Sequence, residues 1–166
     1  MVRQRKESFV INLLSFTIAV HGLSATIWVG GMFFAYVCLR PSVTALEPPQ
    51  RLQLWAEVFR RFFFWVWIVV IALPLAGYVQ IIGVYDGFEN VGLYMHIMHV
   101  MGWVMIGLFV LLYFYPYRLF RAAVSAQDWP VAARHLNMIR QIVGINLVFG
   151  LIVIVIATAG RFWGLI

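Results

Sequence analysis

Residues 142–159, IVGINLVFGLIVIVIATA, form a stretch without a single charged side chain. A helix rises about 1.5 Å per residue, so roughly 20 apolar residues cross the hydrocarbon core of a bilayer. Inside hydrocarbon the backbone polar groups must bond to one another, and a helix achieves this within one segment. The stretch therefore predicts a transmembrane helix. Residues 131–141 before it carry Arg134 and Arg140 among apolar residues, and they predict a basic amphipathic lead-in.

Three further stretches share this apolar character, and they lie at residues 9–39, 62–84 and 93–115. Turn-forming residues separate them. We expect Pro41 to end the first helix, Asp86-Gly87 to follow the second and Pro116 to end the third. The sequence thus predicts an all-α, polytopic integral membrane protein, a four-transmembrane-helix bundle in which residues 1–166 form a single membrane domain.

The composition supports this class. Of the 166 residues, 64% are hydrophobic and 11% charged, compared with roughly 25% charged residues in soluble domains. The net charge of +6 does not indicate nucleic acid, because the basic residues flank apolar stretches, where lipid headgroups account for them. No hydrolase triad, phosphate loop or carboxylate pair is found in the sequence. The single cysteine, Cys38, excludes an intramolecular disulfide, and we expect it to be buried near a helix end.

The loop charges suggest an orientation. The first and third connections carry arginines at positions 40, 51, 60, 61, 118, 121, 134 and 140. The opposite side carries fewer basic residues, at positions 3, 5, 6 and 161. Because cytoplasmic loops are enriched in arginine and lysine, both termini are predicted to be periplasmic.

Three histidines within apolar stretches are the strongest pointer to function. His21 lies in the first predicted helix, and His96 and His99 lie one turn apart in the third. These two helices run in the same direction, so the three side chains fall toward one membrane side. Ionisable groups inside a membrane are costly and usually mark a site. Neutral imidazoles on facing helices are typical haem ligands, although such histidines also form plain interhelical hydrogen bonds.

The methionines make copper a second candidate for the metal. Met95 and Met98 flank His96, and thioether together with imidazole suits Cu(I). Copper held by Met95, His96, Met98 and His99 is therefore the alternative to haem.

Several motifs resemble the small CopD-like membrane proteins. They are His21-x6-Trp28-Val29-Gly30-Gly31-Met32-Phe33-Phe34, Phe59-Arg60-Arg61-Phe62-Phe63, Gly92-Leu93-Tyr94-Met95-His96-Ile97-Met98, Pro116-Tyr117-Arg118, and Ile139-Arg140-Gln141-Ile142-Val143-Gly144-Ile145-Asn146-Leu147 with Gly160-Arg161. The name of that family implies copper handling. The chain is also similar to HemJ-like protoporphyrinogen oxidases, which bind b-type haem. In those proteins a Leu-His-x-Lys element opens a helix, whereas here Met98 replaces the lysine.

From these features we predict a protein of the bacterial inner membrane that binds haem b in the lipid bilayer. It would pass electrons to a quinone or a partner membrane subunit, which makes a haem-dependent oxidoreductase one form of this hypothesis. His21 and His96 would be the axial ligands, with His99 as the substitute for His96, and Arg161 could pair with a propionate. The alternatives are CopD-like copper binding or transport, and a structural subunit of a larger membrane complex. Assembly into an oligomer is compatible with all three.

Overall fold

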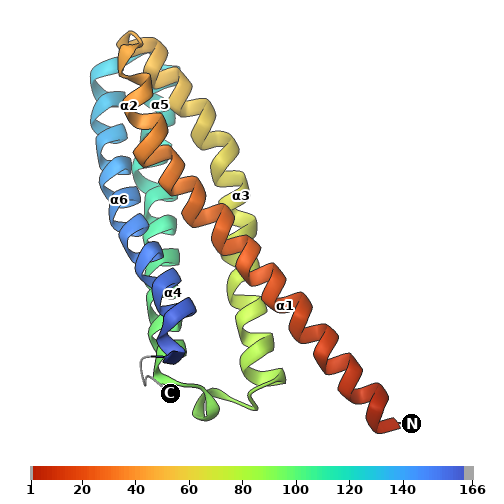
Figure 1. Cartoon of the computed structure of the whole chain (residues 1–166). Coiled ribbons are helices and arrows are strands. Elements are labelled where there is room, and N and C mark those ends of the chain that lie inside the picture. Colours follow the sequence, from red (N-terminus) through yellow and green to blue (C-terminus); the bar gives the residue numbers. More distant parts are fainter. Residues whose placement is uncertain (1, 163–166) are drawn as a thin grey trace.

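In the computed structural model, which describes residues 2–162 and the side chains of residues 10–160 and 162, the chain forms four long helical segments that run up and down (Figure 1). The first segment is continuous and consists of α1 (Val2–Phe33), the π-helix η1 (Phe34–Leu39), α2 (Arg40–Ser42) and the short 3-10 turn η2 (Val43–Ala45). The second is α3 (Pro48–Gly83), which is followed by the 3-10 turn η3 (Phe88–Asn90).

The third segment consists of α4 (Leu93–Leu112), the π-helix η4 (Tyr113–Tyr117) and α5 (Arg118–Ser125). The fourth is α6 (Trp129–Ala159), followed by η5 (Gly160–Phe162). Each of the four segments is long and apolar enough to cross a membrane. The all-α, four-helix membrane architecture predicted from the sequence is thereby confirmed.

The predicted helix ends at Pro41 and Pro116 were wrong. A proline lacks an N–H, and its ring collides with the carbonyl four residues earlier, here that of Val37 or Leu112. Val37 lies within η1, and Leu112 directly precedes η4. A π-helical turn widens the backbone at these points, so the helix continues through both prolines.

The predicted ends of the other two helices also changed. α3 begins at Pro48 rather than at residue 62, because Leu52, Trp55 and Phe59 recur at helical spacing and bury one face of its first turns. The lead-in predicted at residues 131–141 is not a separate helix but the first part of α6, whose start is capped by the Asp128 carboxylate.

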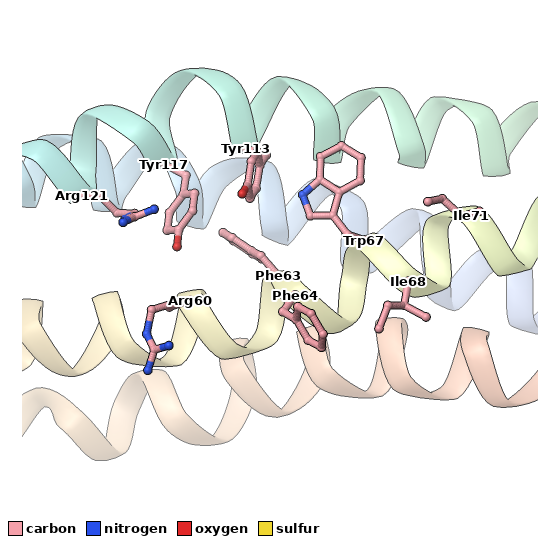
Figure 2. Close-up of a pocket in the computed structure, with 9 residues that line it drawn as sticks. All are labelled: Arg60, Phe63, Phe64, Trp67, Ile68, Ile71, Tyr113, Tyr117 and Arg121. Carbon is pink, nitrogen blue, oxygen red and sulfur yellow. The ribbon is translucent and has the colours of Figure 1, made fainter.

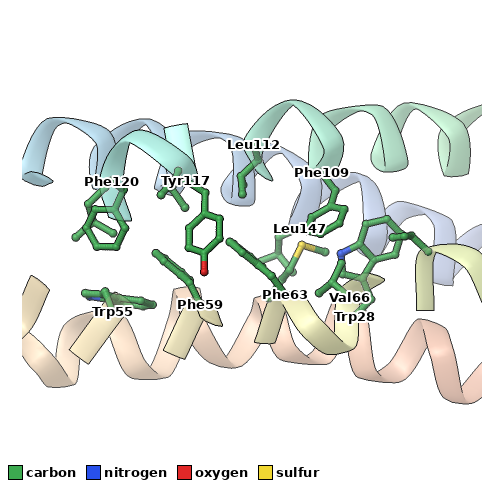
Figure 3. Close-up of a cluster of buried hydrophobic side chains, with 14 of the residues drawn as sticks. Trp28, Trp55, Phe59, Phe63, Val66, Phe109, Leu112, Tyr117, Phe120 and Leu147 are labelled. Atoms are coloured by element: carbon green, nitrogen blue, oxygen red, sulfur yellow. The ribbon is translucent and has the colours of Figure 1, made fainter. Parts of the chain in front are cut away.

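The core is an aromatic ladder (Figure 3), and it lies in the half of the bundle that carries α2 and α5 (Figure 1). Trp55, Phe59 and Phe63 follow each other at intervals of four residues on α3, so they lie on one face. The Phe59 and Phe63 rings stack at 5.2 Å with an interplanar angle of 2°. Tyr117 and Phe120 meet this ladder edge-on from η4 and α5, with ring centroids 4.8 Å from Phe63 and 5.9 Å from Phe59, respectively.

One buried polar side chain links α6 to α4. The Nδ2 atom of Asn146 donates to the carbonyl oxygen of Met105 at 3.3 Å, as expected for a polar residue within a membrane helix. Its Oδ1 atom has no hydrogen-bond partner. The contact therefore gives the amide nitrogen of Asn146 a hydrogen-bond partner but not the amide oxygen.

The other half of the bundle is less closed. α1 packs mainly on α3, and α4 packs mainly on α6. The N-terminal half of α1 leans away from the other helices (Figure 1), and Phe16 on this half and Leu23 further along the helix are largely exposed. Cys38 is also exposed, so the prediction that it is buried was wrong, because its position on η1 faces outward.

Candidate metal centre

The open half of the bundle contains the histidines singled out in the sequence. We call it the histidine end. It consists of residues 73–83 of α3, the connection 84–92, residues 93–99 of α4, and the part of α1 around His21. Its connection turns at Asp86 and Gly87, both with positive φ. The φ of +127° at Gly87 is one that side chains other than glycine rarely adopt, so this glycine shapes the turn that carries Phe88 back over α4.

His99 lies within an aromatic box. Its Nε2 atom is 3.5 Å from the hydroxyl of Tyr78 on α3. Its ring centroid is 5.1 Å from that of Phe88, 5.5 Å from Tyr78 and 6.4 Å from Trp103. Trp103 shares a face with His99 because it follows four residues later on α4. These contacts hold the His99 ring in place and leave it half-buried.

His96 is the more accessible of the two histidines on α4. It lies three residues before His99, is exposed, and its ring centroid is 6.0 Å from that of Phe88. Phe88 therefore contacts both histidine rings. The two imidazoles lie on adjacent parts of one helix face, which is the spacing that lets neighbouring side chains share a ligand.

Met95 and Met98 are half-buried on the same turns. Met95 precedes His99 by four residues, so the two side chains lie on one helix face. Met95 also lines a cavity of about 410 Å³ together with residues of the connection and the end of the chain, among them Tyr85, Asn90 and Tyr94. A thioether at this place is reachable from outside the bundle.

His21 contacts α3 rather than α4. Its Nδ1 atom lies 3.1 Å from the carbonyl oxygen of Leu73, and its ring lies against Gly77. Since a carbonyl only accepts, Nδ1 carries the hydrogen and Nε2 carries the lone pair. A histidine held in this way has the form in which imidazoles bind metals.

His21 on α1 and His99 on α4 pack against α3 at the same level of that helix but on different faces of it. His21 contacts Gly77 and His99 contacts Tyr78, the next residue. Consecutive side chains on a helix with 3.6 residues per turn point about 100° apart. The prediction that His21 and His96 act on one haem stays a prediction. The Arg161 side chain lies outside the described residues.

The donor set at the histidine end fits a soft metal. Among the side chains that the structure describes, no three His, Cys, Asp or Glu residues lie close enough together to hold a metal ion. A site here therefore needs methionine sulfur or fewer than three such residues. Imidazole and thioether donors together suit Cu(I), whereas Mg²⁺ and Ca²⁺ prefer oxygen ligands.

A family model described as copper resistance protein D matches residues 56–159. The chain belongs to the CopD family. The resemblance to CopD-like proteins is thereby confirmed, and the segment that matches the CopD model contains Met95, His96, Met98 and His99 but not His21. No curated protein and no solved structure matches the chain.

Tyr78 and Phe88 were not singled out from the sequence. Both contact His99, yet neither has helical spacing to it, because they belong to α3 and to the connection between α3 and α4. The Asp86-Gly87 turn was the one sequence signal that could have found Phe88. A tight turn folds the next residues back toward the helix that follows.

Proposed function

We propose that this CopD-family membrane protein binds copper as Cu(I) at the histidine end and takes part in copper handling. His99 and Met95 would be the principal ligands, with His96 and Met98 as further donors within one turn. The observation that carries the proposal is the joint position of two imidazoles and two thioethers on the first turns of α4. The family match supports it, because its printed description refers to copper resistance and its range includes these residues.

The geometry supports ligation by one helix. His99 follows Met95 by four residues and His96 by three, and residues at these intervals are neighbours on a helix surface. The aromatic box would orient the central ligand. If Nε2 of His99 donates to the Tyr78 hydroxyl, which lies 3.5 Å away, Nδ1 carries the lone pair that a metal requires. Copper is the cargo in this proposal, and the chain supplies the donors.

The charge distribution supports an orientation for copper exchange. The arginines at positions 40, 51, 60, 61, 118, 121, 134 and 140 lie toward the end opposite the histidines. If this arginine-rich end is cytoplasmic, the histidine end is periplasmic, and so are both termini. We propose that the protein lies in a bacterial inner membrane and exchanges copper on the periplasmic side.

The test is competition for Cu(I) against a chromogenic chelator with detergent-purified protein. We expect the wild-type chain to bind about one Cu(I), and Met95→Leu and His99→Ala each to weaken binding by more than the roughly 10–100-fold loss typical of an orienting partner. Met95→Leu nearly conserves side-chain volume, so the fold is retained. Met138→Leu and His135→Ala, both near the start of α6 and away from the histidine end, are the matched controls. Equal affinity in all five proteins would contradict the proposal.

Haem b is the second candidate, and one observation favours it. The hydrogen bond from His21 Nδ1 to the Leu73 carbonyl leaves Nε2 with the lone pair that an axial ligand uses. The similarity to HemJ-like oxidases that we expect from the sequence would agree with haem ligation, although Met98 stands where those proteins have a lysine. Electron transfer to a quinone or a partner subunit would follow. An optical spectrum of the same sample separates the two proposals: a Soret band lost in His21→Ala supports haem, whereas a colourless copper-binding protein contradicts it.

A further inference from the structure

A groove lies between α3 and the segment η4–α5 (Figure 2), and the part of α3 that lines it, residues 60–71, precedes the histidine end. It has a volume of about 350 Å³. Aromatic side chains from both walls line it, namely Phe63 and Trp67 from α3, and Tyr113 and Tyr117 from η4. The two tyrosine rings are 5.4 Å apart on the π-helical turn, and π-helical turns inside α-helices are frequent at functional sites.

Two arginines, one from each wall, lie at the end of the groove nearest the polar connections. Arg60 on α3 is held by the Glu57 carboxylate at 2.8 Å, with both side chains more than half exposed. Arg121 on α5 stands 5.8 Å from the Tyr117 ring centroid, and none of the carboxylates that the structure describes lies within salt-bridge distance of it. The groove mouth therefore carries more positive than negative charge.

The rest of the groove is apolar and open to the side. Phe64, Ile68 and Ile71 on α3 complete its lining and are 62%, 45% and 56% exposed. In a membrane-spanning helix such side chains face lipid. An acyl chain can therefore enter the groove sideways, while a headgroup lies at the arginines.

We propose that this groove binds one anionic phospholipid. Its phosphate binds Arg121 at the groove mouth, Arg60 on the other wall adds positive charge there, and one acyl chain runs along Trp67, Ile68 and Ile71. Arginine binds phosphate through strong charge-assisted hydrogen bonds, and basic pockets between membrane helices suit anionic headgroups. A neutral quinone would gain little from two guanidinium groups, so the charge favours the lipid. This inference is independent of the copper proposal, because none of its residues lies at the histidine end.

The chain offers a matched control for each arginine. Arg61 follows Arg60 on α3 but does not line the groove, and its side chain is 76% exposed. Arg118 is exposed on α5, three residues before Arg121, and is likewise outside the groove lining. The double variants R60Q/R121Q and R61Q/R118Q thus remove the same charge from the same two segments.

The experiment is native mass spectrometry of the detergent-purified full chain, titrated separately with phosphatidylglycerol, phosphatidylcholine and ubiquinone. The wild-type protein and R61Q/R118Q should retain one phosphatidylglycerol, and R60Q/R121Q should bind it on the order of tenfold more weakly. The single variant R121Q should show part of this loss, and it removes only a surface contact. Equal phosphatidylglycerol affinity in both double variants, or equal retention of the neutral ligands by the wild-type protein, would overturn the proposal.

Discussion

Replacing Phe59 with alanine is the sharpest test of how this bundle is held together. Phe59 is 4% exposed and lies at the centre of the aromatic ladder. Its ring centroid is 5.1 Å from Trp55, 5.2 Å from Phe63, 5.9 Å from Phe120 and 6.3 Å from Tyr117. The substitution removes all four ring contacts at once and leaves a cavity between α3, η4 and α5.

The loss of unfolding free energy in Phe59→Ala is estimated from the lost ring contacts and not from the transfer of the ring out of water. Lipid chains are as apolar as a protein core, so burial in a membrane adds little hydrophobic free energy. Each aromatic pair contributes about 0.5–1.5 kcal/mol beyond its buried area, and these contributions are not fully additive. We therefore expect Phe59→Ala to lower the free energy of unfolding by about 2–4 kcal/mol, near the range for Phe→Ala in soluble cores.

The assay is reversible unfolding in mixed micelles with increasing SDS, followed by circular dichroism and tryptophan fluorescence. Phe64→Ala is the matched control, because Phe64 lies on the same helix and is 62% exposed. We expect this control to change the free energy of unfolding by less than about 0.5 kcal/mol. Equal effects of the two substitutions would refute the reasoning, since ring contacts would then not determine stability.

Three further substitutions test other contacts. A Cβ added at Gly31 would collide with the Phe62 ring, whereas none of the described atoms lies near a Cβ added at Gly30. Gly31→Ala should therefore lower the free energy of unfolding in the SDS assay by about 1–3 kcal/mol, and Gly30→Ala should not lower it. The reverse order would contradict this packing. Asn146→Leu should change stability by less than about 1 kcal/mol, because one interhelical hydrogen bond contributes about 0.6 kcal/mol and Oδ1 has no partner, so a loss above about 2 kcal/mol would be inconsistent with the structure. Tyr78→Phe should lower Cu(I) affinity by roughly 10–100-fold if its hydroxyl orients His99, while Tyr115→Phe, an exposed position, should leave chelator competition unchanged.

The sequence was sufficient to predict the spans but not their ends. Uncharged stretches such as residues 142–159 predict membrane helices from solvation alone, and the structure confirms four of them. The helix ends at Pro41 and Pro116 were mispredicted because a neighbouring π-helical turn absorbs the proline ring, and its position depends on local strain that no sequence pattern shows. Cys38 was mispredicted because which face of η1 packs inward depends on the neighbouring helices.

In the candidate site, contacts within one helix could be predicted from the sequence and contacts between helices could not. Met95, His96 and His99 could be grouped from their spacing, because residues at intervals of three and four share a helix face whatever the rest of the chain does. Tyr78 and Phe88 could not, because their contacts with His99 depend on how the connection after α3 folds back. The hydrogen bond from His21 to Leu73 joins residues 52 positions apart, and helical spacing gives no information about such a pair.

The most direct test of the copper proposal is X-ray absorption spectroscopy at the copper edge, on purified protein loaded with one equivalent of Cu(I). We predict a mixed coordination shell of nitrogen and sulfur in the wild-type protein, with the sulfur contribution reduced in Met95→Leu and the nitrogen contribution reduced in His99→Ala. A shell without sulfur, or one that neither substitution changes, would contradict ligation by the first turns of α4.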